Sequence, residues 1–251
     1  MRIVSLCPSL TELVFDLGRG DELVGITDYC VHPAERVAML EKVGGTKTPR
    51  IARILELAPD VVLLNQEENR IEDAQALRAA GVVCHASFPK TVADTAAMVR
   101  DIGSALDSGG AAERIALDIE ARAARVRRAA AGKREVSWAY LIWRKPWMAV
   151  NDDTFASALL SLAGGRNVFG SAPARYPEIT PADLAARAPE LVLLCTEPFP
   201  FEPRNIDELT ELTKIPRSSF HIADGEYLSW HGSRTLAGID YAEKLIRDAR
   251  G

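Results

Sequence analysis

This chain has few of the features that would place it in a membrane or a secretory pathway. No segment approaches the roughly 18 consecutive apolar residues that a transmembrane helix needs, so we expect no membrane span. Met1 and Arg2 run directly into the apolar residues Ile3 to Leu6, which leaves no room for a signal peptide. The numbered sequence therefore predicts a cytoplasmic protein. The alternative is a periplasmic or lipid-anchored protein whose export signal was removed before numbering.

Cysteine and histidine are scarce, with four of each among 251 residues. The cysteines show neither CxxC spacing nor a dense framework, so ordinary thiols are expected rather than disulfides or a zinc site. A zinc or manganese site would need three or four converging ligands, and the histidines are scattered. We predict no metal site and no intrinsic cofactor.

Signatures of catalysis and of nucleic-acid binding are also missing. Ser5, Ser9 and Ser229 lie outside any GxSxG elbow. No P-loop or GxGxxG follows an expected strand. The formal net charge of −5 argues against binding to phosphate backbones, which requires clustered Lys and Arg. We therefore predict neither an enzyme nor a nucleic-acid-binding protein, and no catalytic residues.

What the chain does contain is a repeat. Ala58-Pro59-Asp60 before the apolar run 61–64 returns as Ala188-Pro189-Glu190 before the apolar run 191–194. A helical pattern precedes each copy, at 51–57 and at 181–187. This arrangement predicts two similar α/β units, and ligands commonly bind in clefts between such units.

Short apolar runs alternate with helical patterns along the chain, which favours mostly parallel sheets. Expected strands are 3–6, 23–26, 61–64, 82–84 and 136–143, and expected helices are 9–17, 51–57, 71–80, 92–106 and 111–131. A helix of about twenty residues spans roughly 30 Å, enough to connect two lobes. We predict an α/β fold of two Rossmann-like lobes, residues 1–105 and 134–251, joined by a long backbone helix within 106–133.

Aromatic residues make up only 6% of the chain, so their positions are informative. Most follow expected strands, where the carboxyl ends of parallel strands form binding crevices. They predict a pocket that stacks against a large, partly apolar ligand. These aromatic residues are Tyr29, Trp143, Trp147, Tyr176, Phe199, Phe201, Tyr227 and Trp230.

Several segments resemble, in order, the class III periplasmic binding proteins, the solute receptors with a helical spine. The cobalamin-binding branch of the substrate-binding proteins of ABC importers is the most similar. The segments are 2–13, 24–30, 43–45, 141–144, 163–169, 224–226 and 229–230, and they extend over essentially the whole chain.

The resemblance implies a receptor that holds a corrinoid between two lobes without catalysis. Tyr29, Trp143 and Tyr176 match ring-contacting aromatic residues, while Trp230 and Arg234 fall in a loop that closes the pocket. The complete set of expected ligand-binding residues is Tyr29, Asn65, Trp143, Arg144, Trp147, Tyr176, Trp230, His231 and Arg234. His32 or His231 is the alternative assignment as an axial ligand to the cobalt of the corrinoid.

The resemblance also implies an ABC permease as partner, which docks on one glutamate of each lobe. Ala52 and Ala182 occupy those two positions here, at the same offset as Ala58 and Ala188. This argues against a permease partner and favours a cytoplasmic corrinoid-binding relative over a transporter subunit. We also expect a monomer.

Two alternative functions remain at this point. A siderophore or haem receptor of the same fold is favoured if arginines converge on an anionic ligand; the candidates are Arg144, Arg166, Arg175 and Arg234. A cytoplasmic enzyme or chaperone for a corrinoid or metal chelate is favoured if Cys30, His32 or His231 lies at ligand distance.

Overall fold

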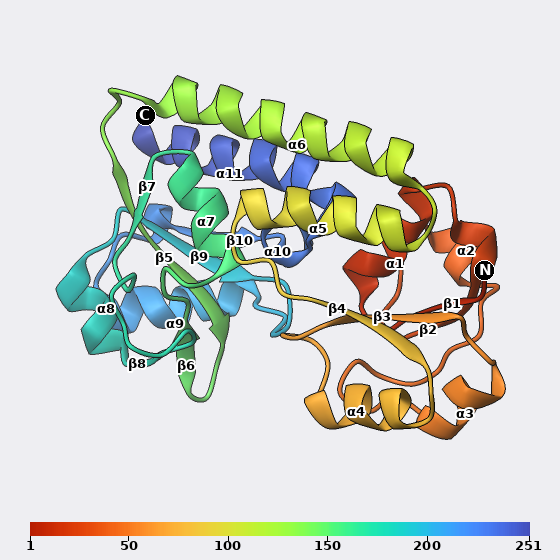
Figure 1. Ribbon diagram of the computed structural model, residues 1–251. Coiled ribbons are helices and arrows are strands. Elements are labelled where there is room, and N and C mark those ends of the chain that lie inside the picture. Colours follow the sequence, from red (N-terminus) through yellow and green to blue (C-terminus); the bar gives the residue numbers. More distant parts are fainter. The chain divides into compact units, whose positions relative to one another are not determined.

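The computed structural model describes residues 1–251 as two compact units (Figure 1). Unit 1 comprises Met1–Pro89, Ala93–Glu120 and His231–Thr235. Unit 2 comprises Lys90–Val92, Ala121–Trp230 and Leu236–Gly251. The expected long helix is α6 (Gly109–Ala130), and the division between the units falls within it. The lobe boundaries predicted from the sequence, at 105/106 and 133/134, remain a prediction.

Unit 1 contains one parallel sheet with strand order β2-β1-β3-β4. Its strands are β1 (Ile3–Ser5), β2 (Leu23–Ile26), β3 (Val61–Asn65) and β4 (Val83–Ser87). Its helices, besides the first half of α6, are α1 (Pro8–Asp16), α2 (Ala34–Val37), α3 (Ile51–Glu56), α4 (Ile71–Ala79) and α5 (Val92–Ala105). Every residue of β3 is buried, as expected for a central strand covered on both faces.

Local chemistry explains where these elements end. Gly18 and Gly81 follow α1 and α4 with φ of +78° and +85°, a conformation that glycine adopts without steric cost. Val4, Val62 and Leu64 of the sheet pack with Ile54 of α3 and Leu77 of α4 to form the core beneath these helices. The helices and strands that the sequence predicts in unit 1 are confirmed, to within a few residues at their ends.

Unit 2 contains a six-stranded sheet with the order β10-β9-β5-β6-β8, and β7 pairs with β5. The strands β7, β9 and β10 run parallel to their neighbours, whereas β6 and β8 are antiparallel additions. The strands are β5 (Val136–Trp143), β6 (Trp147–Ala149), β7 (Gly165–Asn167), β8 (Glu178–Ile179), β9 (Leu191–Cys195) and β10 (Phe220–Ala223). The predicted α/β class with mostly parallel sheets is confirmed.

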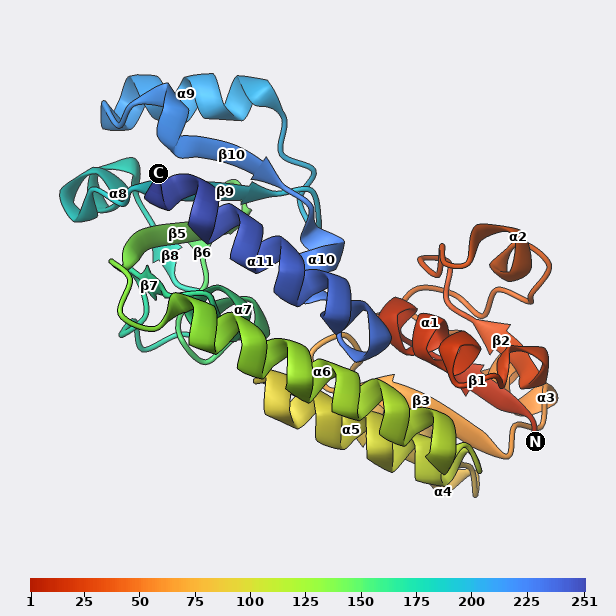
Figure 2. The ribbon, with the colours of Figure 1, turned by 90° about the horizontal axis from the view of Figure 1, so that it is seen from above.

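The helices of unit 2 are α7 (Phe155–Leu162), α8 (Pro181–Arg187), α9 (Pro203–Thr213), α10 (Gly225–Ser229) and α11 (Thr235–Arg250). Short 3₁₀ turns complete the chain: η1 (Gly20–Glu22), η2 (Arg217–Ser219) and η3 (Gly232–Arg234). The C-terminal half of α6 lies beside α11 (Figure 2), where Arg125 pairs with Asp240 and Glu243 at 2.8 and 2.9 Å. None of the helices combines the length and apolarity that crossing a membrane requires.

The repeated sequence has the same structure in both units, and we call residues 58–60 and 188–190 the Ala-Pro-acid joints. Ala58 and Ala188 have nearly identical left-handed φ values, 44° and 43°, and each stops the helix before it. In unit 1 the Asp60 carboxylate accepts a hydrogen bond from the Arg2 backbone amide at 2.6 Å. In unit 2 the Glu190 carboxylate accepts one from the Ser137 amide at 2.9 Å. Each acid therefore ties the start of one strand to the start of its neighbour.

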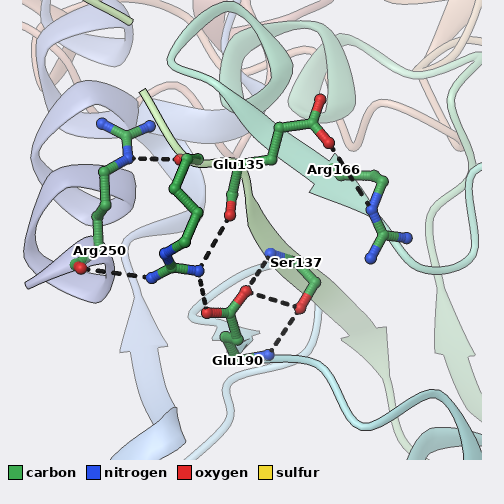
Figure 3. A network of polar contacts seen from close by, with 6 residues as sticks. Glu135, Ser137, Arg166, Glu190 and Arg250 are labelled. Atoms are coloured by element: carbon green, nitrogen blue, oxygen red, sulfur yellow. Dashed lines mark hydrogen bonds and ion pairs between the residues drawn. The ribbon is translucent and has the colours of Figure 1, made fainter. Parts of the chain in front are cut away.

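Glu190 is also the centre of a larger polar network (Figure 3). The Ser137 hydroxyl donates to its carboxylate at 3.1 Å, and the Arg134 guanidinium forms an ion pair with it. Arg250 donates to the Arg134 carbonyl at 2.8 Å, so the end of α11 joins the network. The backbone amide of Ser137, with smaller effects from Arg134, lowers the pKa of Glu190 below its usual range.

We expect Glu190→Ala to lower the free energy of unfolding by about 1–2 kcal/mol, because the poorly exposed Ser137 amide loses its acceptor. Urea denaturation followed by circular dichroism measures the change. Glu135→Ala is the control, since the only side-chain contact of Glu135 is a 4.0 Å ion pair with Arg166, and it should cost less than about 0.5 kcal/mol. Equal losses in the two variants would contradict this role of the joint.

The stabilisation by Glu190 should depend on pH. Because its pKa is lower in the folded state, its contribution is present above the unfolded value of about 4.3 and is lost as the pH falls through the folded value. The difference in unfolding free energy between the wild type and Glu190→Gln should therefore shrink as the pH is lowered from 7 to 3. A constant difference over this range would show that the charge of Glu190 is unimportant.

Candidate functional site

The expected ligand-binding residues are distributed over the two units. Unit 2 contributes Trp143, Arg144, Trp147, Tyr176 and Trp230, and unit 1 contributes Tyr29, Asn65, His231 and Arg234. Some of these residues lie at or just after the carboxyl ends of parallel strands. Binding crevices of α/β sheets form at these strand ends.

Four aromatic rings form a continuous cluster in unit 2. Trp143, at the carboxyl end of β5, meets the ring of Phe199 edge-on with centroids 5.6 Å apart. Phe199 contacts Phe201 at 4.7 Å, and Phe201 stacks on Trp147 at 5.9 Å with the ring planes 3° apart. Phe201 is buried, whereas Trp143 is 40% exposed. The cluster therefore supports one indole that remains open to solvent.

Phe199 and Phe201 belong to the aromatic residues that the sequence marks as informative, but they are not among the expected ligand-binding residues. They hold Trp143 and Trp147 in one cluster, so they position two of the expected ligand-binding residues. A signal for them exists in the sequence: Pro198, Pro200 and Pro203 interrupt this segment and stiffen its backbone.

Next to this aromatic cluster lies a polar pair, formed by Arg144 and Glu208. The Nε and Nη2 of Arg144 donate to the two carboxylate oxygens of Glu208 at 2.9 and 2.8 Å, and its guanidinium lies 5.6 Å from the centroid of the Trp147 ring. The arginine lowers the pKa of Glu208, so the pair stays charged at neutral pH. An open hollow of about 410 Å³ adjoins the pair, lined by Arg144, Phe199, Arg204, Asn205 and Glu208.

The two remaining residues of unit 2 are less open. Tyr176 is half-buried, and the Arg175 guanidinium lies 5.5 Å from its ring centroid. Trp230 is only 8% exposed, and its indole nitrogen donates to Glu197 at 2.6 Å. Trp230 is therefore buried, and its indole N–H already has an acceptor in Glu197.

In unit 1, Tyr29 follows β2 and Asn65 is the last residue of β3, and the two differ strongly in exposure. Tyr29 is 62% exposed, and its ring lies over the glycine at position 45, where an added Cβ would be 3.3 Å from Cε2. Asn65 is fully buried, and its side-chain oxygen accepts hydrogen bonds from the amides of Glu67 and Glu68 at 2.9 and 3.3 Å. Tyr29 offers an open ring, whereas Asn65 organises the turn that follows β3.

Arg234 and His231 belong to the short C-terminal segment of unit 1. The Nε and Nη2 of Arg234 donate to the two carboxylate oxygens of Glu12 on α1, each at 2.7 Å. The side chains of this pair are only 12% and 18% exposed. His231 is buried. Sequence reasoning missed Glu12, although it lies within the segment 2–13 that carried the family resemblance.

The arginines do not form a uniformly basic surface. Arg144 pairs with Glu208, Arg166 with Glu135, Arg175 with Asp153 and Arg234 with Glu12. The structure contains no group of three or more His, Cys, Asp or Glu side chains placed to hold a metal ion. Cys30 is buried, and its sulfur contacts the hydroxyls of Thr11 and Thr27 at 3.0 and 3.1 Å.

Comparison with known proteins decides the family. The model of the periplasmic binding protein family matches residues 3–211. The chain belongs to this family. It is 26% identical over 191 residues to the vitamin B12-binding protein of Vibrio parahaemolyticus, covering 76% of this chain and 69% of the relative. It is 25% identical over 238 residues to the protein of the same name from Vibrio campbellii, covering 95% and 86%.

Solved structures agree with this family membership. The periplasmic vitamin B12-binding protein BtuF of Vibrio cholerae superimposes with a TM-score of 0.85 at 22% identity, covering 99% of this chain and 97% of that one. The periplasmic heme-binding protein RhuT of Roseiflexus sp. RS-1, in its apo form, also gives 0.85, at 25% identity and 100% and 99% coverage. The predicted resemblance to periplasmic binding proteins and the predicted fold are confirmed.

The expectation of a cytoplasmic protein is wrong. Members of the matched family are periplasmic binding proteins, and the similar solved structures from Vibrio cholerae and Roseiflexus are described as periplasmic. The expectation depended on Met1 being the first residue of the encoded protein, which a printed sequence does not establish.

The Glu12–Arg234 pair should be strongly coupled because it is bidentate and poorly exposed. A double-mutant cycle of Glu12→Gln and Arg234→Gln should give a coupling of about 1–3 kcal/mol in urea denaturation. The exposed pair Arg217–Asp207 is the control and should give less than about 1 kcal/mol. Similar couplings for both pairs would mean that burial adds nothing to the Arg234 contact.

Proposed function

We propose that this chain is a non-catalytic solute receptor that binds cobalamin or a related corrinoid. The observation that carries the proposal is the open indole of Trp143, supported from behind by the rings of Phe199, Phe201 and Trp147. The proposal is supported by relatives that are named vitamin B12-binding proteins, one of which aligns with 95% of the chain.

The chemistry of a corrinoid suits these surfaces. A corrin ring is broad, has an apolar periphery and carries polar amide side chains, so it can stack on an aromatic face and accept or donate hydrogen bonds around it. Trp143 and Tyr29 have the exposed rings, and we assign them to direct contact. We assign Trp147 to the support of Trp143 through Phe201 and Phe199, and we keep Tyr176, Trp230 and His231 as further proposed ligand-binding residues.

Arg144 and Arg234 receive a different role from the one expected at first. Each donates two hydrogen bonds to a carboxylate of its own unit. We propose that the two arginines fix the local structure of their units through these bidentate contacts.

A haem receptor is the second candidate, because the heme-binding protein RhuT is 25% identical over the full chain. Haem iron in proteins takes an axial ligand such as His or Tyr. The exposed phenol of Tyr29 is the candidate for this role, with His32, three residues further along the same loop, as the other.

The proposal on partners depends on one exposed position in α3 and one in α8. Ala52 and Ala182 are exposed on α3 and α8. A methyl group cannot form an ion pair, so we propose that any ABC permease does not dock through acidic side chains at these two positions. We also propose that the receptor acts as a monomer.

The direct test is an absorbance titration of the purified protein with cyanocobalamin, dicyanocobinamide and hemin, combined with thermal melting. We expect a saturable spectral change and a higher melting temperature with at least one of the two corrinoids. A saturable Soret shift with hemin alone would support the haem receptor instead. No response to any of the three compounds would refute both functions.

Trp143→Ala should weaken corrinoid binding at least tenfold, which corresponds to about 1.4 kcal/mol and is within the range expected for an exposed aromatic contact. Isothermal titration calorimetry with the corrinoid that binds wild type gives the affinity. Trp143→Phe keeps an aromatic ring and is the matched control, expected to retain most of the affinity. Unchanged binding in Trp143→Ala, with an unchanged melting temperature, would remove Trp143 from the site.

A further inference from the structure

Gly44 and Gly45 in unit 1 lack a side chain for different reasons. Gly44 has a φ of +101°, which residues with a Cβ rarely adopt, and an added Cβ would lie 2.6 Å from the Thr48 carbonyl oxygen. Gly45 does not have a positive φ, so its backbone conformation is open to other residues. The reason for a glycine at position 45 must therefore lie in what surrounds it.

The ring of Tyr29 lies where a side chain at position 45 would extend. An added Cβ would be 3.3 Å from Cε2 and 4.0 Å from the phenol oxygen of Tyr29. Two carbon atoms prefer a separation of about 3.5–4.0 Å, so the ring would have to move. The hydroxyl of Thr48 is also close, at 3.0 Å, but Thr48 is exposed and its side chain can turn to another rotamer. Gly45 therefore lets one edge of the Tyr29 ring rest on the backbone.

The main chain on both sides of Tyr29 is anchored. The Asp28 amide donates to the carbonyl of Gly44 at 2.9 Å, so the loop of Tyr29 is tied to the two glycines. After Tyr29, the Cys30 carbonyl accepts a hydrogen bond from Lys42 Nζ at 3.2 Å. Because these contacts fix the two chain segments relative to each other, a new Cβ would displace the ring rather than the backbone.

The rest of the Tyr29 ring stays open. Tyr29 is 62% exposed, so a ligand can reach the ring although one edge contacts Gly45. A ring that is already oriented loses less entropy when a ligand stacks on it. Aromatic contacts depend on the mutual orientation of the partners, so a small rotation of the ring changes the contact.

We propose that Gly45 is a positioning residue of the receptor, because it sets the orientation of the Tyr29 ring toward the ligand. Gly45 acts through Tyr29 and has no side chain with which to bind the ligand itself. The inference rests on the proposed function, in which the Tyr29 ring contacts a corrinoid. It concerns Gly45 and not Gly44, whose glycine is explained by its own backbone conformation.

Calorimetric titration of Gly45→Ala with cyanocobalamin and dicyanocobinamide tests the inference. We expect an affinity about threefold or more below that of the wild type, because the displaced ring makes a poorer aromatic contact. Gly109→Ala is the matched control: Gly109 is exposed at the start of α6, and an added Cβ there meets no atom within 4 Å. Gly109→Ala should bind as tightly as the wild type.

A double-mutant cycle with Tyr29→Ala shows whether Gly45 acts through the ring. Tyr29→Ala should weaken binding by itself, and Gly45→Ala should then cause no further loss, since the ring that it displaces is gone. A general disturbance of the loop would lower the affinity in both backgrounds. Melting temperatures show whether each variant is folded. If Gly45→Ala alone does not fold, Tyr29→Ala should restore folding in the double variant, and failure to do so would overturn the inference.

The contact is also measurable without a ligand. The chain has five tyrosines, and in protein that is isotope-labelled at the tyrosine rings the NMR signal of Tyr29 is the one that Tyr29→Ala lacks. Gly45→Ala should shift this signal because the ring moves, whereas Gly109→Ala should leave it in place. An unshifted Tyr29 signal in Gly45→Ala would contradict the positioning role.

The outcomes distinguish the inference from the proposed function. If a corrinoid binds the wild type and Gly45→Ala binds it equally well, the positioning role is wrong while the receptor function stands. The same conclusion follows if Gly45→Ala costs as much affinity in the Tyr29→Ala background as in the wild type. If neither corrinoid binds the wild type, the proposed function fails and the inference fails with it.

Discussion

One contact is repeated in both units, and the sheets depend on it: an acidic side chain accepts the backbone amide at the start of the neighbouring strand. Asp60 does this for the amide of Arg2, and Glu190 for the amide of Ser137. The preceding alanine, in a left-handed conformation, turns the chain from helix into strand. A shift of one residue in either strand would exchange the two faces of the sheet, so these contacts also set which side chains are buried.

The register has direct consequences for the site. With β1 and β3 aligned at Ile3 and Val61, the end of β3 brings Asn65 to the edge of the sheet, next to the turn with Glu68. With β5 and β9 aligned at Trp138 and Leu191, Trp143 lies beyond the last residue that pairs with β9 and meets Phe199, which follows β9. The same type of contact at one end of each sheet therefore helps to position the candidate ligand-binding residues at the other end.

The polar groups of the site fall into two kinds. Arg144 and Arg234 are engaged by carboxylates, whereas the buried Asn65 Nδ2 has no hydrogen-bond partner in the protein. Arginine–carboxylate pairs satisfy each other, so they contribute rigidity more than recognition.

Much of the fold could be predicted from the sequence. The period of apolar residues, the glycines after α1 and α4 and the Ala-Pro-acid repeat depend on local conformation, and local conformation is encoded by neighbouring residues. The segments that resemble periplasmic binding proteins were sufficient to predict the family. The location could not be predicted in this way, because it depends on an export signal and not on the folded chain.

The site was predicted less completely, for a physical reason. Arg144 and Glu208 are 64 residues apart, and Arg234 and Glu12 are 222 apart, so no local pattern connects them. The same is true of the stacking of Trp147 on Phe201 and of the unpaired Nδ2 of Asn65. The sequence by itself determined the elements, the two α/β units and the family. Only the tertiary structure decided which charges are neutralised and which polar groups stay available, because pairing depends on distances between segments far apart in the chain.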